Sequence, residues 1–210
     1  MISSITIFLL IILIISVVIH EVSHGYAAYV QGDMTAYYED RLTLNPIKHV
    51  DPIGSILVPL VTTFAGFPFG WAKPVPFNPF NLRNQRWGEL WVAIAGPASN
   101  IIIALIFGGI IRFSGLPLDN PFIGLSMLVV LINLGLALFN LIPVPPLDGS
   151  KVLFAFLPYH LQKFRPALER YSFFLVLILI LIPQFSFVLG TIVGFFFSLI
   201  TGVPGSAIGF

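Results

Sequence analysis

Long apolar runs constrain this chain more than any other feature of its sequence. Residues 4–31, 87–113 and 122–141 each form a run at least as long as the roughly 20 residues that a helix needs to cross a bilayer. The whole chain is 57% hydrophobic and only 9% charged, whereas a soluble domain carries about 25% charged residues. We therefore predict an all-α polytopic membrane protein, folded as one helical bundle and surrounded by the lipid bilayer.

Composition limits the chemistry of this bundle. A net charge of +1 gives no reason to expect nucleic acid as a partner. The chain has no cysteine, so disulfides, thiolate catalysis and Cys-ligated metals are excluded and any metal ligand must be His, Asp or Glu. We expect one membrane-embedded domain over residues 1–210, with a core at about 4–155 and a C-terminal apolar hairpin at about 171–201.

The basic residues indicate how the chain crosses the membrane. All except Arg112 lie in three polar regions, and such residues concentrate in cytoplasmic loops; the three regions contain Arg41 and Lys48, then Lys73, Arg83 and Arg86, then Lys151, Lys163, Arg165 and Arg170. If these regions share one side, the apolar segment Ile53–Phe67 between the first two does not cross. At about 1.5 Å per residue it spans roughly 22 Å, less than the roughly 30 Å hydrocarbon core, so we predict a re-entrant segment.

The second half of the first apolar run contains the pattern His20-Glu21-Val22-Ser23-His24. Side chains four apart on a helix project from one face, so His20 and His24 can hold one metal ion while Glu21 acts as a base. Two incidental helix histidines are the alternative. Ionisable groups inside a membrane helix cost about 2.5–3.5 kcal/mol each, so three within five residues require a compensating role.

A catalytic zinc site needs a third protein ligand and an open position for water. The candidates are Asp148, Asp51, His49 and His160. With a re-entrant segment after the first helix, two crossings return the chain to the side of His20 and His24 at Asp148, so crossing parity selects Asp148. A turn-forming Asp-Gly pair is the alternative explanation for this residue.

Three motifs in order make the chain resemble the site-2 protease family of intramembrane zinc metalloproteases. They are His20-Glu-Val-Ser-His24, Gly96-Pro97-Ala-Ser-Asn100 and Asn140-Leu-Ile-Pro-Val-Pro-Pro-Leu-Asp148-Gly149, within a resemblance over about residues 8–155. The resemblance implies that Asp148 is the third ligand of one catalytic Zn²⁺. It also favours a substrate-binding or oxyanion role for Asn140, for which capping of nearby backbone is an equal alternative.

Two further stretches, residues 44–54 and 70–78, resemble the compact branch of that family, which lacks appended PDZ or CBS domains. In this branch a short membrane-re-entrant β-element is thought to receive the substrate. The alternation in Arg41-Leu42-Thr43-Leu44 is typical of a strand, and its edge could hold an extended peptide. For Asn100 we favour helix-to-helix hydrogen bonding over catalysis, and the roles of His49 and Asp51 stay open.

The sequence therefore predicts hydrolysis of peptide bonds within or near transmembrane segments of a protein or peptide substrate. Zinc activates a water molecule and Glu21 serves as general base. We expect a multi-pass protein of a prokaryotic plasma (inner) membrane, with its active site toward the cytoplasmic side. A metal-binding membrane transporter or channel, lined by the same His and Asp side chains, is the alternative function.

Overall fold

The computed structural model describes residues 4–58 and 72–204, and this part of the chain is entirely helical apart from loops and turns. Its helices in chain order are α1 (Ser4–Val30), α2 (Thr35–Tyr38), η1 (Pro46–His49), η2 (Pro52–Leu57), η3 (Pro79–Asn81), α4 (Gln85–Phe113), α5 (Pro121–Asn140), α6 (Asp148–Phe156), α7 (Tyr159–Gln162), α8 (Arg165–Arg170), α9 (Ser172–Leu181) and α10 (Pro183–Thr201). Four of them, α1, α4, α5 and α10, are long and apolar enough to cross a membrane. The prediction of a polytopic helical membrane protein is confirmed.

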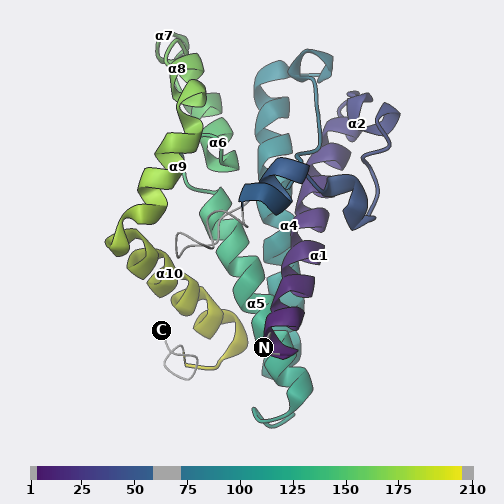
Figure 1. Cartoon of the computed structure of the whole chain (residues 1–210), viewed down its shortest axis with the longest axis vertical. Coiled ribbons are helices and arrows are strands. Elements are labelled where there is room, and N and C mark those ends of the chain that lie inside the picture. The colour runs from purple at the N-terminus through teal and green to yellow at the C-terminus, as the bar shows by residue number, and fades with distance from the viewer. Residues whose placement is uncertain (1–3, 59–71, 205–210) are drawn as a thin grey trace.

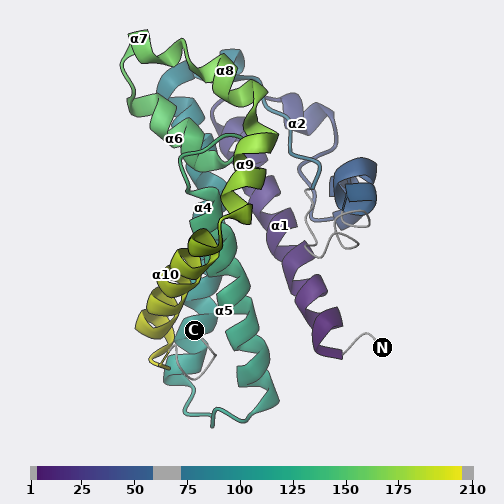
Figure 2. The ribbon, with the colours of Figure 1, turned by 60° about the vertical axis from the view of Figure 1, so that its left-hand side comes forward.

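Helix α4 lies at the centre of the bundle and packs against α1, α5, α6 and α10 (Figures 1 and 2). The main apolar core fills the space between α4, α5 and α10 and consists of Ala104, Ile111, Ile123, Val130, Leu134, Val193, Phe197 and Val203. Many large apolar side chains elsewhere on the long helices are exposed. Such a surface is unfavourable in water and suits lipid.

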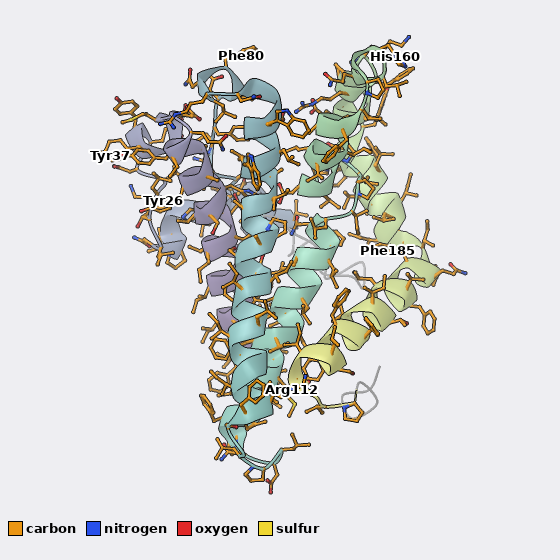
Figure 3. All side chains as sticks on the ribbon, turned by 180° about the vertical axis from the view of Figure 1, so that it is seen from behind. Tyr26, Tyr37, Phe80, Arg112, His160 and Phe185 are labelled. Carbon is orange, nitrogen blue, oxygen red and sulfur yellow. The ribbon has the colours of Figure 1, made fainter. Side chains whose placement is uncertain are left out.

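The short helices α2, η1, η3 and α6–α8 gather at one end of the bundle, which we call the polar end (Figure 1). Backbone bonds hold its parts together: Arg83 N–H donates to Gln31 O at 3.0 Å. The turn between α4 and α5 lies at the opposite end, where Figure 3 also places Arg112, far from Phe80 and His160. The three basic regions thus share one end, as their charge pattern predicted.

The described residues on either side of 59–71 meet near η1. Lys73 N–H donates to His49 O at 2.9 Å, so the two flanks of the segment are directly bonded. The first part of the segment is η2, whose first turn is capped by the Asp51 carboxylate. The prediction of a re-entrant segment over Ile53–Phe67 falls largely on residues 59–67, which lie outside the described residues.

The predicted β-element is wrong for the residues that the structure describes. Residues 41–44 form an irregular bend before η1, and residues 72–78 run extended without a strand partner. Pro74 and Pro76 have no N–H to donate to a ladder. A side chain bonds the backbone of this segment instead: Arg41 Nη2 donates to Lys73 O at 2.8 Å and to Pro74 O at 3.2 Å.

The C-terminal apolar residues form a broken helix with α9 and α10 end to end, where the sequence had suggested a hairpin. At the polar end, Arg165 at the start of α8 forms an ion pair with Glu89 near the start of α4. At the other end, Arg112 Nη1 donates to Leu199 O at 2.7 Å, which places the last turn of α10 beside the end of α4. Helix α9 has 10 residues and spans about 15 Å, half of the thickness of a bilayer core. The extended backbone of Ile182, just before Pro183, bends the chain between α9 and α10.

This path predicts on which side of the membrane the exposed residues lie. Because the chain has no cysteine, single cysteines can be introduced as Phe80→Cys, Leu118→Cys and Pro204→Cys and labelled with a membrane-impermeant thiol reagent in oriented vesicles. We expect Leu118→Cys and Pro204→Cys to react from one side and Phe80→Cys from the other. With a C-terminal hairpin, Pro204→Cys would instead be labelled from the same side as Phe80→Cys.

Candidate metal centre

Two histidines of α1 face each other at the centre of the bundle. Their Nε2 atoms are 3.0 Å apart and the rings meet edge to face with centroids 4.6 Å apart. Both side chains are buried, although each carries two polar nitrogens. His20 and His24 lie one helical turn apart on one face, as the sequence spacing predicted.

Asp148, in the first turn of α6, completes a group of three. Its Oδ2 atom lies 3.1 Å from His20 Nε2 and 3.0 Å from His24 Nε2. Within residues 4–58 and 72–204, these three side chains form the one cluster of His, Asp or Glu groups close enough to share a metal ion.

The other three candidates for a third ligand lie elsewhere. His49 is buried and its Nε2–H donates to Thr43 O at 2.8 Å. Asp51 accepts from the backbone of Ile53 at the start of η2. His160 is exposed at the tip of the polar end (Figure 3).

The second nitrogen of each histidine ring is held by helix α4. His24 Nδ1–H donates to Val92 O at 2.6 Å, and because a carbonyl can only accept, the hydrogen must sit on Nδ1. His20 Nδ1–H donates to Asn100 Oδ1 at 2.6 Å. In the neutral form of each ring, Nε2 then presents a lone pair to the Asp148 carboxylate, and three such acceptors need a cation between them.

The spacing of these three atoms fits a zinc ion. Two imidazole nitrogens and one carboxylate oxygen are a common donor set for catalytic zinc, and bonds of about 2.0–2.1 Å in a tetrahedron place neighbouring ligands about 3.3 Å apart. The observed separations of 3.0–3.1 Å are close to that value. A cavity of about 130 Å³ opens on the cluster and leaves room for a water molecule and a reacting group.

Two glycines allow the helices to approach the cluster. A Cβ on Gly96 of α4 would lie 2.6 Å from His20 Nε2 and would also collide with His24. A Cβ on Gly149 would collide with Leu141 O and lie 2.5 Å from Ile142 O, so only glycine lets the start of α6 pack on the end of α5. The glycines beside Pro97 and Asp148 thus have a steric role in assembling the site.

Glu21 lines the same cavity as the three clustered side chains. Its Oε2 atom accepts a hydrogen bond from Val75 N–H at 2.9 Å. Val75 belongs to the extended segment 72–78, which the sequence had assigned to a β-element. The contact between Glu21 and this segment has no signal in the sequence, because it depends on how the loop returns to α1.

The extended segment is held from its other end by Asp33, just after α1. One carboxylate oxygen of Asp33 accepts from Asn78 N–H at 2.7 Å, and the other accepts from Asn81 Nδ2 at 2.9 Å and from Thr35. Burial raises the pKa of Asp33, but these hydrogen bonds lower it by more, so the net pKa is below its ordinary value. Anionic Asp33 therefore fixes the segment that contacts Glu21.

Two more polar side chains line the metal-centre cavity. Asn140, at the end of α5, donates through Nδ2 to Leu136 O at 2.9 Å, so part of its hydrogen-bonding capacity caps its own helix. Lys151 Nζ lies 3.3 Å from Asp148 Oδ1 and 5.6 Å from the centre of the Phe77 ring. The sequence analysis missed Lys151, although its position one helical turn after Asp148 was a usable signal.

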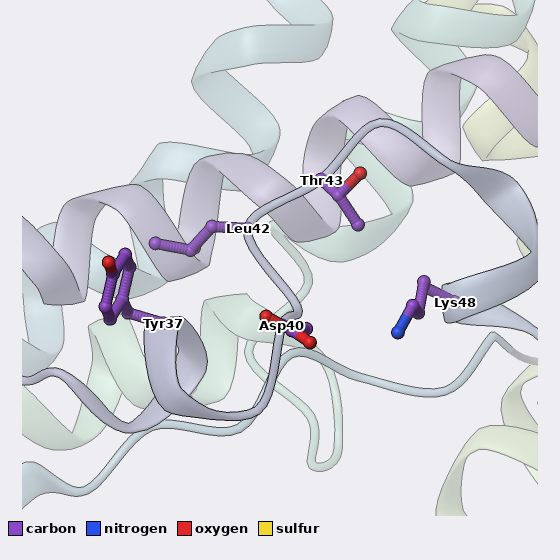
Figure 4. Close-up of a pocket in the computed structure, with 5 residues that line it drawn as sticks. All are labelled: Tyr37, Asp40, Leu42, Thr43 and Lys48. Atoms are coloured by element: carbon purple, nitrogen blue, oxygen red, sulfur yellow. The ribbon is translucent and has the colours of Figure 1, made fainter.

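A larger cavity of about 320 Å³ lies at the polar end and shares no residue with the metal-centre cavity. Figure 4 shows its lining, which consists of Tyr37, Asp40, Leu42, Thr43 and Lys48. This lining contains one carboxylate and no histidine. Size alone therefore does not identify the reactive site, and the smaller cavity has the chemically useful side chains.

Comparisons with known proteins show what the whole chain is similar to. A family model described as Peptidase family M50 matches residues 109–183. The chain is 40% identical to YwhC of Bacillus subtilis, provisionally named a zinc metalloprotease, over 87% of this chain and 84% of that protein. The chain belongs to peptidase family M50, the site-2 protease family. The resemblance inferred from the three motifs is confirmed.

Other M50 relatives are more distant or longer. Rip2 of Mycolicibacterium smegmatis, also provisionally named a zinc metalloprotease, is 30% identical over 81% of this chain and 65% of its own length. The zinc metalloprotease MJ0392 of Methanocaldococcus jannaschii is 29% identical over 71% of this chain and 34% of its own length. No solved structure matches the chain.

The close approach of α4 predicts the effect of one added methyl group. Gly96→Ala would push a Cβ into both histidine rings, so we expect metal affinity to fall at least about tenfold, the size of effect seen when groups around metal ligands are disturbed. Metal analysis of the purified protein measures this. Gly109→Ala in the same helix is the matched control, because its Cβ meets nothing within 4 Å; equal metal content in the two variants would contradict the steric role.

Proposed function

We propose that the chain is an intramembrane zinc metalloprotease that hydrolyses peptide bonds within or near transmembrane segments. The observation that carries the proposal is a buried cluster of two imidazoles and a carboxylate that opens, with Glu21, on one cavity inside a bundle of membrane-length helices. Membership of a peptidase family and the names of the relatives, which describe zinc metalloproteases, support it.

One zinc ion is proposed to be held by His20, His24 and Asp148. When bound, it supplies a Lewis acid that polarises the scissile carbonyl and activates a water molecule. The chain's own groups prepare this site, because Val92 and Asn100 orient the two imidazoles. Lys151 on Asp148 Oδ1 keeps the other oxygen, Oδ2, directed at the histidines.

Glu21 is proposed to be the general base and then the general acid. It takes a proton from the attacking water and returns it to the leaving amide nitrogen, so no covalent intermediate with the protein is needed. The hydrogen bond from Val75 N–H orients its carboxylate toward the cavity. The Asn140 amide has a second N–H besides the one on Leu136 O, and this N–H can stabilise the oxyanion that forms at the scissile carbonyl.

The proposed substrate is a transmembrane segment of a protein or peptide. About 15 Å of helix α1 separates His20 from the polar end, so the site lies inside the bundle and below the loops. A substrate helix must unwind locally, since its carbonyls are otherwise hydrogen bonded. The basic residues at the polar end support its location on the cytoplasmic side, and the bacterial and archaeal relatives favour a prokaryotic plasma membrane.

A pair of variants separates metal binding from catalysis. Glu21→Gln should keep one zinc per chain but slow cleavage of a membrane-embedded reporter substrate by about 100- to 10,000-fold, the usual contribution of a general acid–base group. Asp148→Ala should lose both zinc and cleavage. Zinc analysis and a cleavage assay in proteoliposomes measure the two effects.

The exposed Asp119 in the turn between α4 and α5 offers a control, and Asp119→Ala should keep both properties. Undiminished cleavage by Glu21→Gln would contradict the mechanism. Zinc flux into the proteoliposomes without peptide hydrolysis would favour the transporter or channel instead.

Asn140 can be tested separately from the metal. If its free N–H stabilises the oxyanion, Asn140→Leu should lower kcat about 100- to 1,000-fold while KM and zinc content stay close to wild type. Steady-state kinetics with the same reporter measure the split. A kcat within twofold of wild type would contradict the oxyanion role, and the capping contact with Leu136 O would then be the role of Asn140.

A further inference from the structure

A row of uncharged polar side chains continues from His20 into the apolar interior of the bundle. Asn100 of α4 and Asn133 of α5 are both fully buried, and Ser16 of α1 is nearly so. Asn100 Nδ2 donates to Asn133 Oδ1 at 2.8 Å, and Asn100 Oδ1 faces His20 Nδ1 at 2.6 Å. Two amides in the middle of a membrane bundle are costly unless every polar atom is used.

The direction of every bond in this row follows from one backbone carbonyl. Asn133 Nδ2 lies 2.9 Å from Val129 O, an atom that can only accept, so this end of the amide must be the nitrogen. The second N–H of the same nitrogen reaches Ser16 Oγ at 3.0 Å. Asn133 Oδ1 therefore points to Asn100, whose nitrogen must donate to it.

The same reasoning then orients Asn100 and His20. With its nitrogen on Asn133, and also 3.4 Å from Ser16 O, Asn100 presents its oxygen to His20 Nδ1. An amide oxygen only accepts, so the imidazole hydrogen is held on Nδ1 and the Nε2 lone pair faces Asp148 and His24. If Asn133 were turned over, its nitrogen would face the Asn100 nitrogen and its oxygen would face Val129 O. If Asn100 were turned over, its oxygen would face the Asn133 oxygen.

We propose that Asn133 is a positioning residue that fixes the tautomer of His20, acting through Asn100 from the carbonyl of Val129. The relay does for His20 what Val92 O does directly for His24. Metal-bound histidines often use a carboxylate for this purpose. Neutral amides transmit the same direction in the apolar interior without the desolvation cost of a buried charge.

This inference rests on the proposed zinc site, because the orientation of His20 matters only if Nε2 binds a metal. The experiment uses Asn133→Leu, which is similar in size and has no acceptor. In zinc-free protein with ¹⁵N-labelled histidine, NMR of the imidazoles should show His20 with the hydrogen on Nδ1 in wild type and a mixture of both tautomers in the variant. Zinc affinity, measured by chelator competition, should fall about three- to tenfold, less than the 10- to 100-fold typical of groups that contact the ligands directly.

Ser16→Ala is the matched control. It removes one acceptor of the Asn133 nitrogen but leaves Val129 O in place, so the tautomer of His20 and the zinc affinity should stay as in wild type. Asn133→Asp provides a second test if the leucine variant does not fold. Its carboxyl is neutral when buried, accepts from Asn100 and donates to Val129 O, and should therefore preserve the tautomer.

The double variant Asn100→Leu/Asn133→Leu should bind zinc no more weakly than Asn100→Leu alone, because both residues act along one path. A wild-type His20 tautomer in Asn133→Leu, or fully additive losses of zinc affinity, would overturn the relay. Wild-type protein that bound no zinc would overturn the proposed function instead, while the NMR comparison would still decide the role of Asn133.

Discussion

The convergence of two imidazole lone pairs and a carboxylate, all within 3.1 Å, is the constraint on which the rest of this structure depends. In a bundle surrounded by lipid, polar atoms that face away from the cavity have no water to bond, so the remaining polar atoms of the same side chains must be bonded within the protein. Val92 O, Asn100 and Lys151 provide those bonds. Helix α4, which carries two of these three groups, is accordingly the central element of the fold.

Close packing of the helices follows from the same constraint. Groups from α1 and α6 can meet only if α4 and α5 leave space, and the two glycines beside Pro97 and Asp148 create it. Small residues commonly let membrane helices approach each other, because lipid supplies no hydrophobic force to push them together. Here the close approach also sets the chemistry, since the missing side chain of Gly96 faces the atoms that bind the metal in the proposed site.

Much of this arrangement could be predicted from the sequence because its signals are strong and local. Apolar runs located α1, α4 and α5 to within two residues, the spacing of His20 and His24 placed them on one face, and charge placement brought Asp148 to them. The path of residues 171–201 could not be decided from the sequence because Pro183 is compatible with a bend or a hairpin, and the packing of α10 on α4 and α5 favours the bend. The predicted β-element is wrong because an alternating pattern does not reveal what happens to the backbone of residues 72–78. Arg41 already bonds two carbonyls of that segment, and its prolines have no N–H to donate.

The segment of residues 72–78, which forms no strand, determines how the carboxylate of Glu21 is held. In the extended segment, Arg41 and Asp33 hold the two flanks, and the N–H of Val75 between them is free to reach Glu21. Glu21 is therefore oriented by a loop that buried charges anchor at the polar end, while the histidines are oriented from the apolar interior through α4. Two independent parts of the chain, one on each side of the cluster, together define the reactive geometry.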